Sequence, residues 1–260
     1  MEIKQISYAY DRTKQTLHSI SGRIARGKIT TVIGPNGSGK STLLSIMSKN
    51  ATPDSGQVIL DGKSLQAYRA KELARKLAVV HQHNVAPSDL TVEKLVGYGR
   101  IPHRERFASG SEEDQQAIEW ALACTNLLGK RSKTLDALSG GERQRVWIAM
   151  ALAQKTPFLF LDEPTTYLDM YYQYEILELI RRINREHGMT VVMVLHDINQ
   201  AIRYSDRIIA MKDGRVVIQG EPEQVITRET LLDIYGMETI VRTDPEAGLY
   251  IVPVGLGHVR

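Results

Sequence analysis

Residues 28–49 constrain the fold more than any other stretch of this sequence. The β-branched run KITTVI at 28–33 passes through the glycine-rich loop GPNGSGKS at 34–41 into STLLSIMSK, which is typical of a helix. Further apolar runs of strand length, FLFLD at 158–162 and TVVMVLH at 190–196, are also followed by helical patterns. Because these runs do not alternate with polar residues, we expect strands buried on both faces of a mostly parallel sheet, in an α/β fold.

Two regions depart from this alternation of strand and helix. The strand-like pieces MEIKQISYAY and GQVILDG, before residue 90, predict an antiparallel β flank. From about 87 to 154 the pattern is helical, so we expect a helical subdomain inserted into a core made of 1–86 and 155–237. After His196 the sequence predicts a hairpin turned by Asp213-Gly214, then one helix over EPEQVITRETLLDIYG, and beyond the core a short tail, 238–260, with a final hairpin.

Composition excludes several classes of protein. The 33 basic residues nearly balance the 30 acidic ones, and a net charge of +3 gives no electrostatic reason to expect a nucleic-acid partner. The single cysteine, Cys124, cannot form an internal disulfide, and we expect it to fill a helix face. The start of the chain lacks the apolar core of a signal peptide, and the longest apolar run, TVVMVL, is too short to span a bilayer. We therefore expect a cytosolic chain whose membrane role depends on a partner.

The loop GPNGSGKS, here called the phosphate loop, matches the pattern G-x-x-x-x-G-K-[ST] in full. Its glycines allow backbone N–H groups to approach a β-phosphate, and the following helix adds positive charge at its N-terminus. Lys40 can contact the β- and γ-phosphates, and the Ser41 hydroxyl can bind Mg²⁺. A plain glycine turn is the alternative, but the flanking strand and helix favour a nucleotide site. Its predicted residues are Gly34, Pro35, Asn36, Gly37, Ser38, Gly39, Lys40, Ser41 and Thr42.

Four polar residues follow strand-like runs and complete the predicted site. Asp162 ends FLFLD, where open α/β sheets place their ligands, and is predicted to hold Mg²⁺, while Glu163 orients and activates the attacking water. His196 follows the next run and is predicted to contact the γ-phosphate, and Gln82 follows LAVV and is predicted to contact the metal or the water. The alternative for Asp162 and Glu163 is a pair of solvated acids, and the alternative for His196 is a structural role. The two histidines of HQH could suggest a metal site, but a third ligand is missing.

Two further features concern the adenine of the nucleotide and a second helix N-terminus. Tyr10 is the candidate for stacking on adenine, with Tyr8 predicted to point to the opposite face and fill the core. In LSGGERQ at 138–144, Ser139 and Glu142 fit the capping box S-x-x-E. That box leaves Gly140 and Gly141 unexplained, because each lowers helix propensity by about 1 kcal/mol. These glycines predict that something approaches the backbone closely, at the positive end of the helix.

With GPNGSGKS, Gln82, LSGGERQ, FLFLDEP and His196 in this order, the chain resembles the ATP-binding subunits of ABC transporters. The resemblance implies one ABC ATPase domain over 1–260 with the P-loop NTPase fold, using ATP and Mg²⁺. In that family LSGGERQ, here called the signature segment, serves the nucleotide of a second copy in a head-to-tail dimer. Ser139, Gly140, Gly141 and Glu142 are thus implied to act on the ATP held by the partner copy's phosphate loop.

The resemblance also implies membrane partners and a cargo. Such subunits are peripheral proteins on the cytoplasmic face, bound to polytopic permease subunits and linked indirectly to an extracytoplasmic binding protein. The segment 85–107 follows the Gln82 loop and mixes apolar with basic residues, so we expect it to dock on the permease. DEPTTYLD, with Thr166, and VGYGRIPHRERF resemble the ferric-siderophore importers. Haem and cobalamin importers are similar and stay open as alternatives, and a soluble ABC ATPase is less expected without coiled-coil insertions or tandem copies.

Overall fold

The structure, a computed structural model, describes residues 1–11, 14–104 and 111–257. The chain divides into two compact units, and the residues of each unit contact mainly one another. The first unit comprises Met1–Ala67 and Val192–Arg260, and the second comprises Tyr68–Val191. The division falls within strand β8 (Thr190–Val194), whose residues are all buried.

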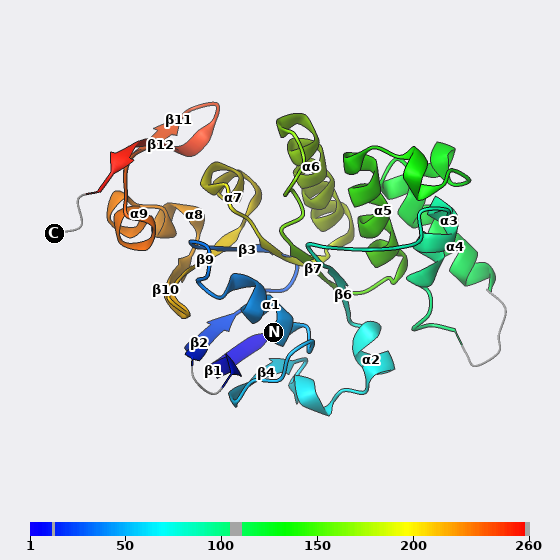
Figure 1. Cartoon of the computed structure of the whole chain (residues 1–260), viewed down its shortest axis with the longest axis horizontal. Helices are drawn as coiled ribbons and strands as arrows, with labels where there is room; N and C mark the ends of the chain where they lie inside the picture. Colours follow the sequence, from blue (N-terminus) through cyan, green and yellow to red (C-terminus); the bar gives the residue numbers. More distant parts are fainter. Residues whose placement is uncertain (12–13, 105–110, 258–260) are drawn as a thin grey trace. The chain divides into compact units, whose positions relative to one another are not determined.

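An antiparallel sheet forms the N-terminal part of the first unit, as predicted (Figure 1). Its strands lie in the order β2-β1-β4-β5, and the short helical turn η1 (Leu65–Ala67) follows them. The sequence pattern did not predict β2, because most of its residues are polar and its apolar residues Leu17 and Ile20 do not alternate. The strands of this sheet are β1 (Glu2–Asp11), β2 (Lys14–Arg23), β4 (Ser55–Leu60) and β5 (Lys63–Ser64).

Parallel pairing, also predicted, begins in the first unit with β3 (Ile29–Ile33) and β9 (Arg207–Lys212). All five residues of β3 are buried, which explains its continuous apolar pattern. The predicted hairpin pairs β9 antiparallel with β10 (Arg215–Gly220). Asp213 and Gly214 both have positive φ, 46° and 71°, as a tight hairpin turn requires. The helices of this region are α1 (Lys40–Met47) and α7 (Ile198–Tyr204).

The C-terminal part of the first unit contains two helices where one was predicted. α8 (Pro222–Val225) ends before Ile226, and α9 (Arg228–Tyr235) begins after Thr227. The single-helix prediction was wrong because Thr227 Oγ1 accepts a hydrogen bond from the amide of Thr230 at 3.1 Å and caps a new helix. The predicted final hairpin is present as β11 (Met237–Asp244) and β12 (Gly248–Leu256).

The second unit joins a buried strand pair to a group of helices. β6 (Leu77–Val80) pairs parallel with β7 (Phe158–Asp162). Helices α3, α4 and α5 pack on one another and appear as the green group in Figure 1. They lie within 87–154, and these limits of a helical subdomain stay a prediction. The helical elements are α2 (Ala70–Ala74), α3 (Val92–Tyr98), α4 (Glu112–Cys124), η2 (Leu128–Lys130), η3 (Leu135–Ala137), α5 (Gly140–Ala153) and α6 (Met170–His187).

A buried arginine ties these three helices together. Arg100, just after α3, is 1% exposed and donates from Nε to Asp114 Oδ1 of α4 at 2.8 Å. Its Nη1 donates to the carbonyl of Ala153, at the end of α5, at 2.8 Å. Gly99 lies so close to α5 that a Cβ there would be 2.1 Å from the carbonyl oxygen of Met150. The G-R pair of VGYGRIPH thus has a structural role, because it fastens the helix that begins in the signature segment.

No helix among the described residues combines the length and the apolar character that crossing a bilayer requires.

Candidate nucleotide site

The predicted site residues are divided between the two units. The first unit contains Tyr10, the phosphate loop with Thr42, and His196. The second unit contains Gln82, Asp162, Glu163 and the signature segment.

The phosphate loop leaves β3 and enters α1 through three glycines whose positive φ angles strain other residues. Gly34 has φ 150°, and a Cβ there would lie 2.2 Å from the carbonyl oxygen of Met211. Gly39 has φ 95°, and a Cβ there would lie 2.6 Å from the Leu17 side chain. Gly37 has φ 79° and open space around it. Two glycines therefore seat the loop against its neighbours, while Gly37 leaves room on the solvent side for a phosphate.

The lysine of the loop is folded onto the loop's own backbone. Lys40 is buried, and its Nζ donates to the carbonyl oxygens of Gly34 at 2.9 Å and Pro35 at 3.0 Å. The first turn of α1 contains no acidic residue that would repel an anion. The amide of Gly214, in the β9–β10 turn, donates to the carbonyl of Ser38 at 3.2 Å and braces the loop from behind. This cradle fits a polyphosphate, because it places the Lys40 charge and the N-terminus of α1 beside the open space at Gly37.

Tyr10 lies beside this loop, as its predicted role requires. Its ring is 71% exposed, and its hydroxyl is 3.1 Å from Thr42 Oγ1 of α1. The prediction for Tyr8 was wrong: its ring meets that of Tyr10 edge-on, with centroids 5.1 Å apart, and it is only half-buried. The reason is geometric, because residues two apart on a strand face the same side. Tyr8 therefore supports the exposed ring of Tyr10.

His196 is the last predicted residue of the first unit. It is exposed two residues after the end of β8, and the next residue, Asp197, starts α7. Asp197 Oδ1 accepts a hydrogen bond from the amide of Gln200 at 2.8 Å, which caps that helix. The buried strand and the cap fix the backbone on both sides of the histidine.

In the second unit the structure brings Gln82 and Glu163 together. Gln82 Nε2 donates to Glu163 Oε2 at 2.6 Å, and Thr166 Oγ1 donates to the same oxygen at 3.0 Å. Asp162 ends the buried strand β7, and Glu163 has a left-handed backbone with φ 50°. A left-handed non-glycine residue costs free energy and is common where the orientation of a side chain matters. The contact between Thr166 and Glu163 was not predicted from the sequence. A threonine three residues after a glutamate is the signal that could have suggested it.

The capping box predicted for the signature segment is confirmed. Ser139 Oγ accepts from the amide of Glu142 at 3.4 Å, and Glu142 Oε2 accepts from the amide of Ser139 at 2.9 Å. The other carboxylate oxygen of Glu142 forms an ion pair with Lys130, a residue that the sequence did not single out. The Lys130 side chain and then the Ser139 amide hold the pKa of Glu142 below its usual range. Glu142 is thus an ionised cap that holds Ser139 in place.

The two glycines of this segment have different surroundings. A Cβ on Gly141 would lie 2.9 Å from Cδ1 of Tyr172, on α6, so Gly141 is required by packing within the chain. A Cβ on Gly140 would meet only Leu168 Cδ2, at 3.8 Å. The predicted close approach to the backbone therefore has an intramolecular partner at Gly141, whereas Gly140 is exposed. Only Gly140 keeps an open face for a ligand.

Comparison with known proteins identifies the family. The model of the ABC transporter family matches residues 17–166 of this chain, from β2 to Thr166. The chain belongs to the ABC transporter family. The matched range includes the phosphate loop, the signature segment, Asp162 and Glu163. It is an ABC-type ATPase with the P-loop NTPase fold.

Individual ABC proteins match most of the chain. The ferric enterobactin transport ATP-binding protein FepC of Escherichia coli (strain K12) is 44% identical over 238 residues, which are 91% of this chain and 88% of the relative. The iron(3+)-hydroxamate import ATP-binding protein FhuC of Bacillus subtilis (strain 168) is 48% identical over 222 residues, 85% of this chain and 82% of the relative. A solved metal-chelate type ABC transporter in an inward-facing conformation superposes with a TM-score of 0.85 at 25% identity, covering 99% of this chain and 97% of that one.

Proposed function

We propose that this chain hydrolyses ATP as a head-to-tail dimer to drive uptake of a ferric siderophore through a membrane permease, at the cytoplasmic face. The similarity to FepC over 91% of the chain carries this proposal, since that relative is named for transport of a ferric chelate. FhuC, named for import of an iron(3+) hydroxamate, supports the same class of cargo.

The residues of the first unit bind the nucleotide in this proposal. Lys40 gives up its hydrogen bonds to the two loop carbonyls and binds the β- and γ-phosphates instead. Its positive charge is then paired with the negative charge of the phosphates. Tyr10 stacks on the adenine, and His196 contacts the γ-phosphate. Ser41, Asp162 and Gln82 hold Mg²⁺, for which a hydroxyl, a carboxylate and an amide oxygen are suitable ligands. When bound, the ion neutralises charge that develops on the phosphates.

Glu163 is the general base of the proposed reaction. Its carboxylate is oriented by Gln82 and Thr166, and it takes a proton from the water that attacks the γ-phosphate. The second copy supplies Ser139 and the open face of Gly140 to that phosphate, as the resemblance implies. The ionised Glu142 carboxylate fixes the position of Ser139 through the Ser139 amide. Ser139 therefore loses little conformational freedom when the two copies meet.

The second unit offers a surface for the permease. A hollow of about 200 Å³ is formed in part by residues that come soon after Gln82 in the chain. It is lined by Asn84, Val85, Ala86, Ser88, Leu135, Asp136, Arg143 and Trp147. Val85 is 92% exposed, and Ile101, in the same predicted docking segment, is 58% exposed. Of that segment, 85–107, residues 105–107 lie outside the described part of the chain. We propose that a cytoplasmic loop of the permease packs its apolar residues here.

Crosslinking tests this surface. Single cysteines at Val85 and Ile101, in a Cys124→Ala background, should crosslink to cytoplasmic loops of the permease. A cysteine at Leu232 of α9, which is 42% exposed, is the control and should not. Crosslinks from Leu232 alone would place the permease elsewhere.

Uptake measurements test the cargo. In a strain that lacks this chain, the wild-type gene should restore uptake of radioactive iron given as a ferric siderophore. Glu163→Gln should not restore it, whereas Glu186→Gln, at an exposed position on α6, should. Restoration of haem or cobalamin uptake, with no effect on ferric siderophores, would make one of those the cargo instead.

A further inference from the structure

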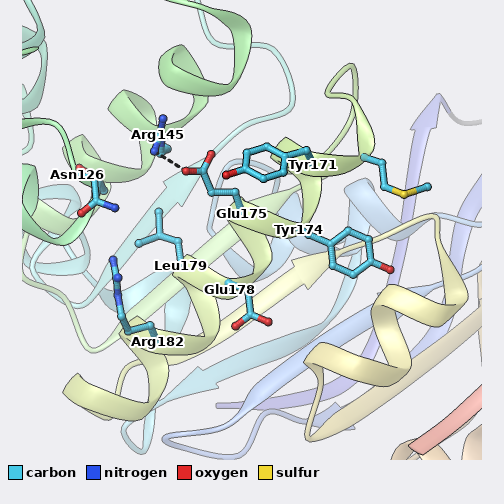
Figure 2. Close-up of a pocket in the computed structure, with 10 residues that line it drawn as sticks. Asn126, Arg145, Tyr171, Tyr174, Glu175, Glu178, Leu179 and Arg182 are labelled. Carbon is cyan, nitrogen blue, oxygen red and sulfur yellow. Dashed lines mark hydrogen bonds and ion pairs between the residues drawn. The ribbon is translucent and has the colours of Figure 1, made fainter. Parts of the chain in front are cut away.

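A hollow of about 870 Å³ lies along α6 in the second unit, beside α5 and the turn after α4 (Figure 2). α6 presents large apolar side chains here, with Met170 74% and Tyr171 73% exposed. Leu179, one side of which is packed in the core, also lines the hollow, and Tyr174 borders it. Exposed aromatic surface of this extent is unusual on a helix that is otherwise amphipathic, and it marks a place where something binds.

The charges around the hollow favour an anion. Arg145 Nη1 pairs with Glu175 Oε1 at 2.8 Å, as the dashed line in Figure 2 shows. Glu178 is held by two bonds from Arg181, at 2.5 and 2.6 Å. These pairs neutralise both carboxylates that line the hollow.

Arg182 has no such counter-charge. Its Nη2 donates to the carbonyl of Cys124 at 2.5 Å, and among the described residues no carboxylate pairs with it. A guanidinium carries five N–H donors, so most of them remain available. Asn126 also lines the hollow, on the same side as Arg182 in Figure 2. A carboxylate is the group that this corner would bind best.

The hollow is also connected to the signature segment. The Tyr171 ring meets the Tyr172 ring edge-on, with centroids 5.4 Å apart, and Tyr172 packs on Gly141. Arg145 belongs to α5, the helix that begins at Gly140, and it bridges to Glu175 on α6. The residues that line the hollow are therefore in contact with those that hold the signature helix against α6.

We propose that this hollow is an effector site for a small aromatic carboxylic acid, and that its occupation changes the rate of ATP hydrolysis through α5. The ring of the ligand lies against Tyr171 and Leu179, and its carboxylate binds Arg182. The change in rate rests on the proposed role of the signature segment, whereas the binding does not.

Calorimetry on the full chain tests the binding. Salicylate and benzoate should bind with one site per chain, while benzylamine, with the opposite charge, and acetate, without the ring, should not. Arg182→Gln should weaken the affinity at least tenfold, as expected for a charge-assisted hydrogen bond. Arg185→Gln is the matched control and should leave the affinity unchanged, because that arginine is exposed on the same helix and does not line the hollow. Tyr171→Ala, at an exposed position, should weaken binding independently.

Hydrolysis measurements test the consequence. Saturating salicylate should change the turnover number in wild type and in Arg185→Gln but not in Arg182→Gln. Binding without any change in rate would overturn the effector role. Equal binding of benzylamine, or no binding of either aromatic acid at millimolar concentration, would overturn the site itself. A change of oligomeric state in Tyr171→Ala, seen by light scattering without ligand, would show that a second copy covers the hollow instead.

Discussion

Gln82 donates a hydrogen bond from Nε2 to Oε2 of Glu163 at 2.6 Å, across a separation of 81 residues. Thr166 Oγ1 donates to the same oxygen at 3.0 Å. Glu163 therefore has one carboxylate oxygen held by two side chains, on a residue whose backbone is left-handed. This arrangement fixes the direction of the carboxylate that we propose as the general base.

Replacing Glu163 by glutamine should separate binding from hydrolysis. Glu163→Gln keeps the shape of the side chain but cannot accept a proton, so turnover should fall at least about a hundredfold. ATP affinity should change little, because the phosphate loop is intact, and gel filtration should show an ATP-bound dimer. Thr166→Val, which removes one bond to the carboxylate, is the control and should give a smaller loss. Hydrolysis by Glu163→Gln near the wild-type rate would place the base at another residue.

Mixed dimers test whether the signature segment serves the other copy. One chain carries Lys40→Ala, which removes the charge that binds the phosphates, and the other carries Ser139→Arg, which blocks approach to the backbone. Both also carry Glu163→Gln, so that bound ATP is trapped. If the sites are shared, one site of the heterodimer collects both defects and the other is intact.

The mixture should then occlude up to one ATP per heterodimer, while each homodimer alone occludes almost none. If each chain used its own signature segment, both sites would be damaged. Heterodimers that form and yet trap no ATP would rule out the shared site.

The two glycines of the signature segment should respond differently to alanine. Gly141→Ala places a Cβ 2.9 Å from the Tyr172 ring, so either the ring or the helix must move, and the midpoint of thermal unfolding should fall. Gly140→Ala has no contact closer than 3.8 Å and raises helix propensity, so the midpoint should hold or rise while ATP hydrolysis falls. Adding Tyr172→Ala to Gly141→Ala should remove the clash. Equal midpoints for both single variants would show that the ring yields freely.

Lys130 should act on hydrolysis through Glu142. Lys130→Met removes the ion pair, so the pKa of the Glu142 carboxyl should rise toward its ordinary value, as carbon NMR would show. The pair is partly exposed, so we expect only about a twofold to fivefold fall in turnover, from a less ordered Ser139. Lys133→Met is the matched control in the same turn. The fall in turnover in Lys130→Met should not add to the fall in Glu142→Gln when both changes are combined. Full additivity of the two losses would mean that Lys130 acts by another route.

The Arg100–Asp114 pair should govern stability in acid. Burial alone would raise the pKa of the Asp114 carboxyl, but the hydrogen bonds from Arg100 and the Ser111 amide outweigh it and leave this pKa below its usual range. A lowered pKa means that the pair contributes fully above about pH 4, the ordinary aspartate value, and is lost as pH falls through the lowered value.

Arg100→Met removes the buried partner of the Asp114 carboxylate and leaves only the partly exposed Arg104 as a counter-charge, so the free energy of unfolding at pH 7 should fall by up to about 3–5 kcal/mol. The penalty should shrink at pH 5, where that carboxylate protonates more easily. Denaturant melts at both pH values measure this, with Arg104→Met as the control, since Arg104 is 3.5 Å from Asp114 and partly exposed. A penalty that does not depend on pH would assign the effect to packing.

The sequence by itself determined the features that depend on neighbouring residues. The phosphate loop, the capping box at Ser139 and the Asp213-Gly214 turn are each specified within a few positions, since backbone conformation and capping are local. The buried strands β3, β7 and β8 were also predictable, because strands buried on both faces show continuous apolar runs. The order of the motifs was enough to indicate the family.

The tertiary structure decided what depends on contacts between distant residues. Nothing in the local pattern indicates that Tyr172 packs on Gly141, that Lys130 pairs with Glu142, or that Arg100 is buried. The break between α8 and α9 depends on one side-chain bond that competes with helix continuation. A side chain's partner is set by how whole elements pack, and many pairings of similar chemistry satisfy the same local pattern. The sequence therefore indicates candidate residues for the site, while packing decides which of them contact one another.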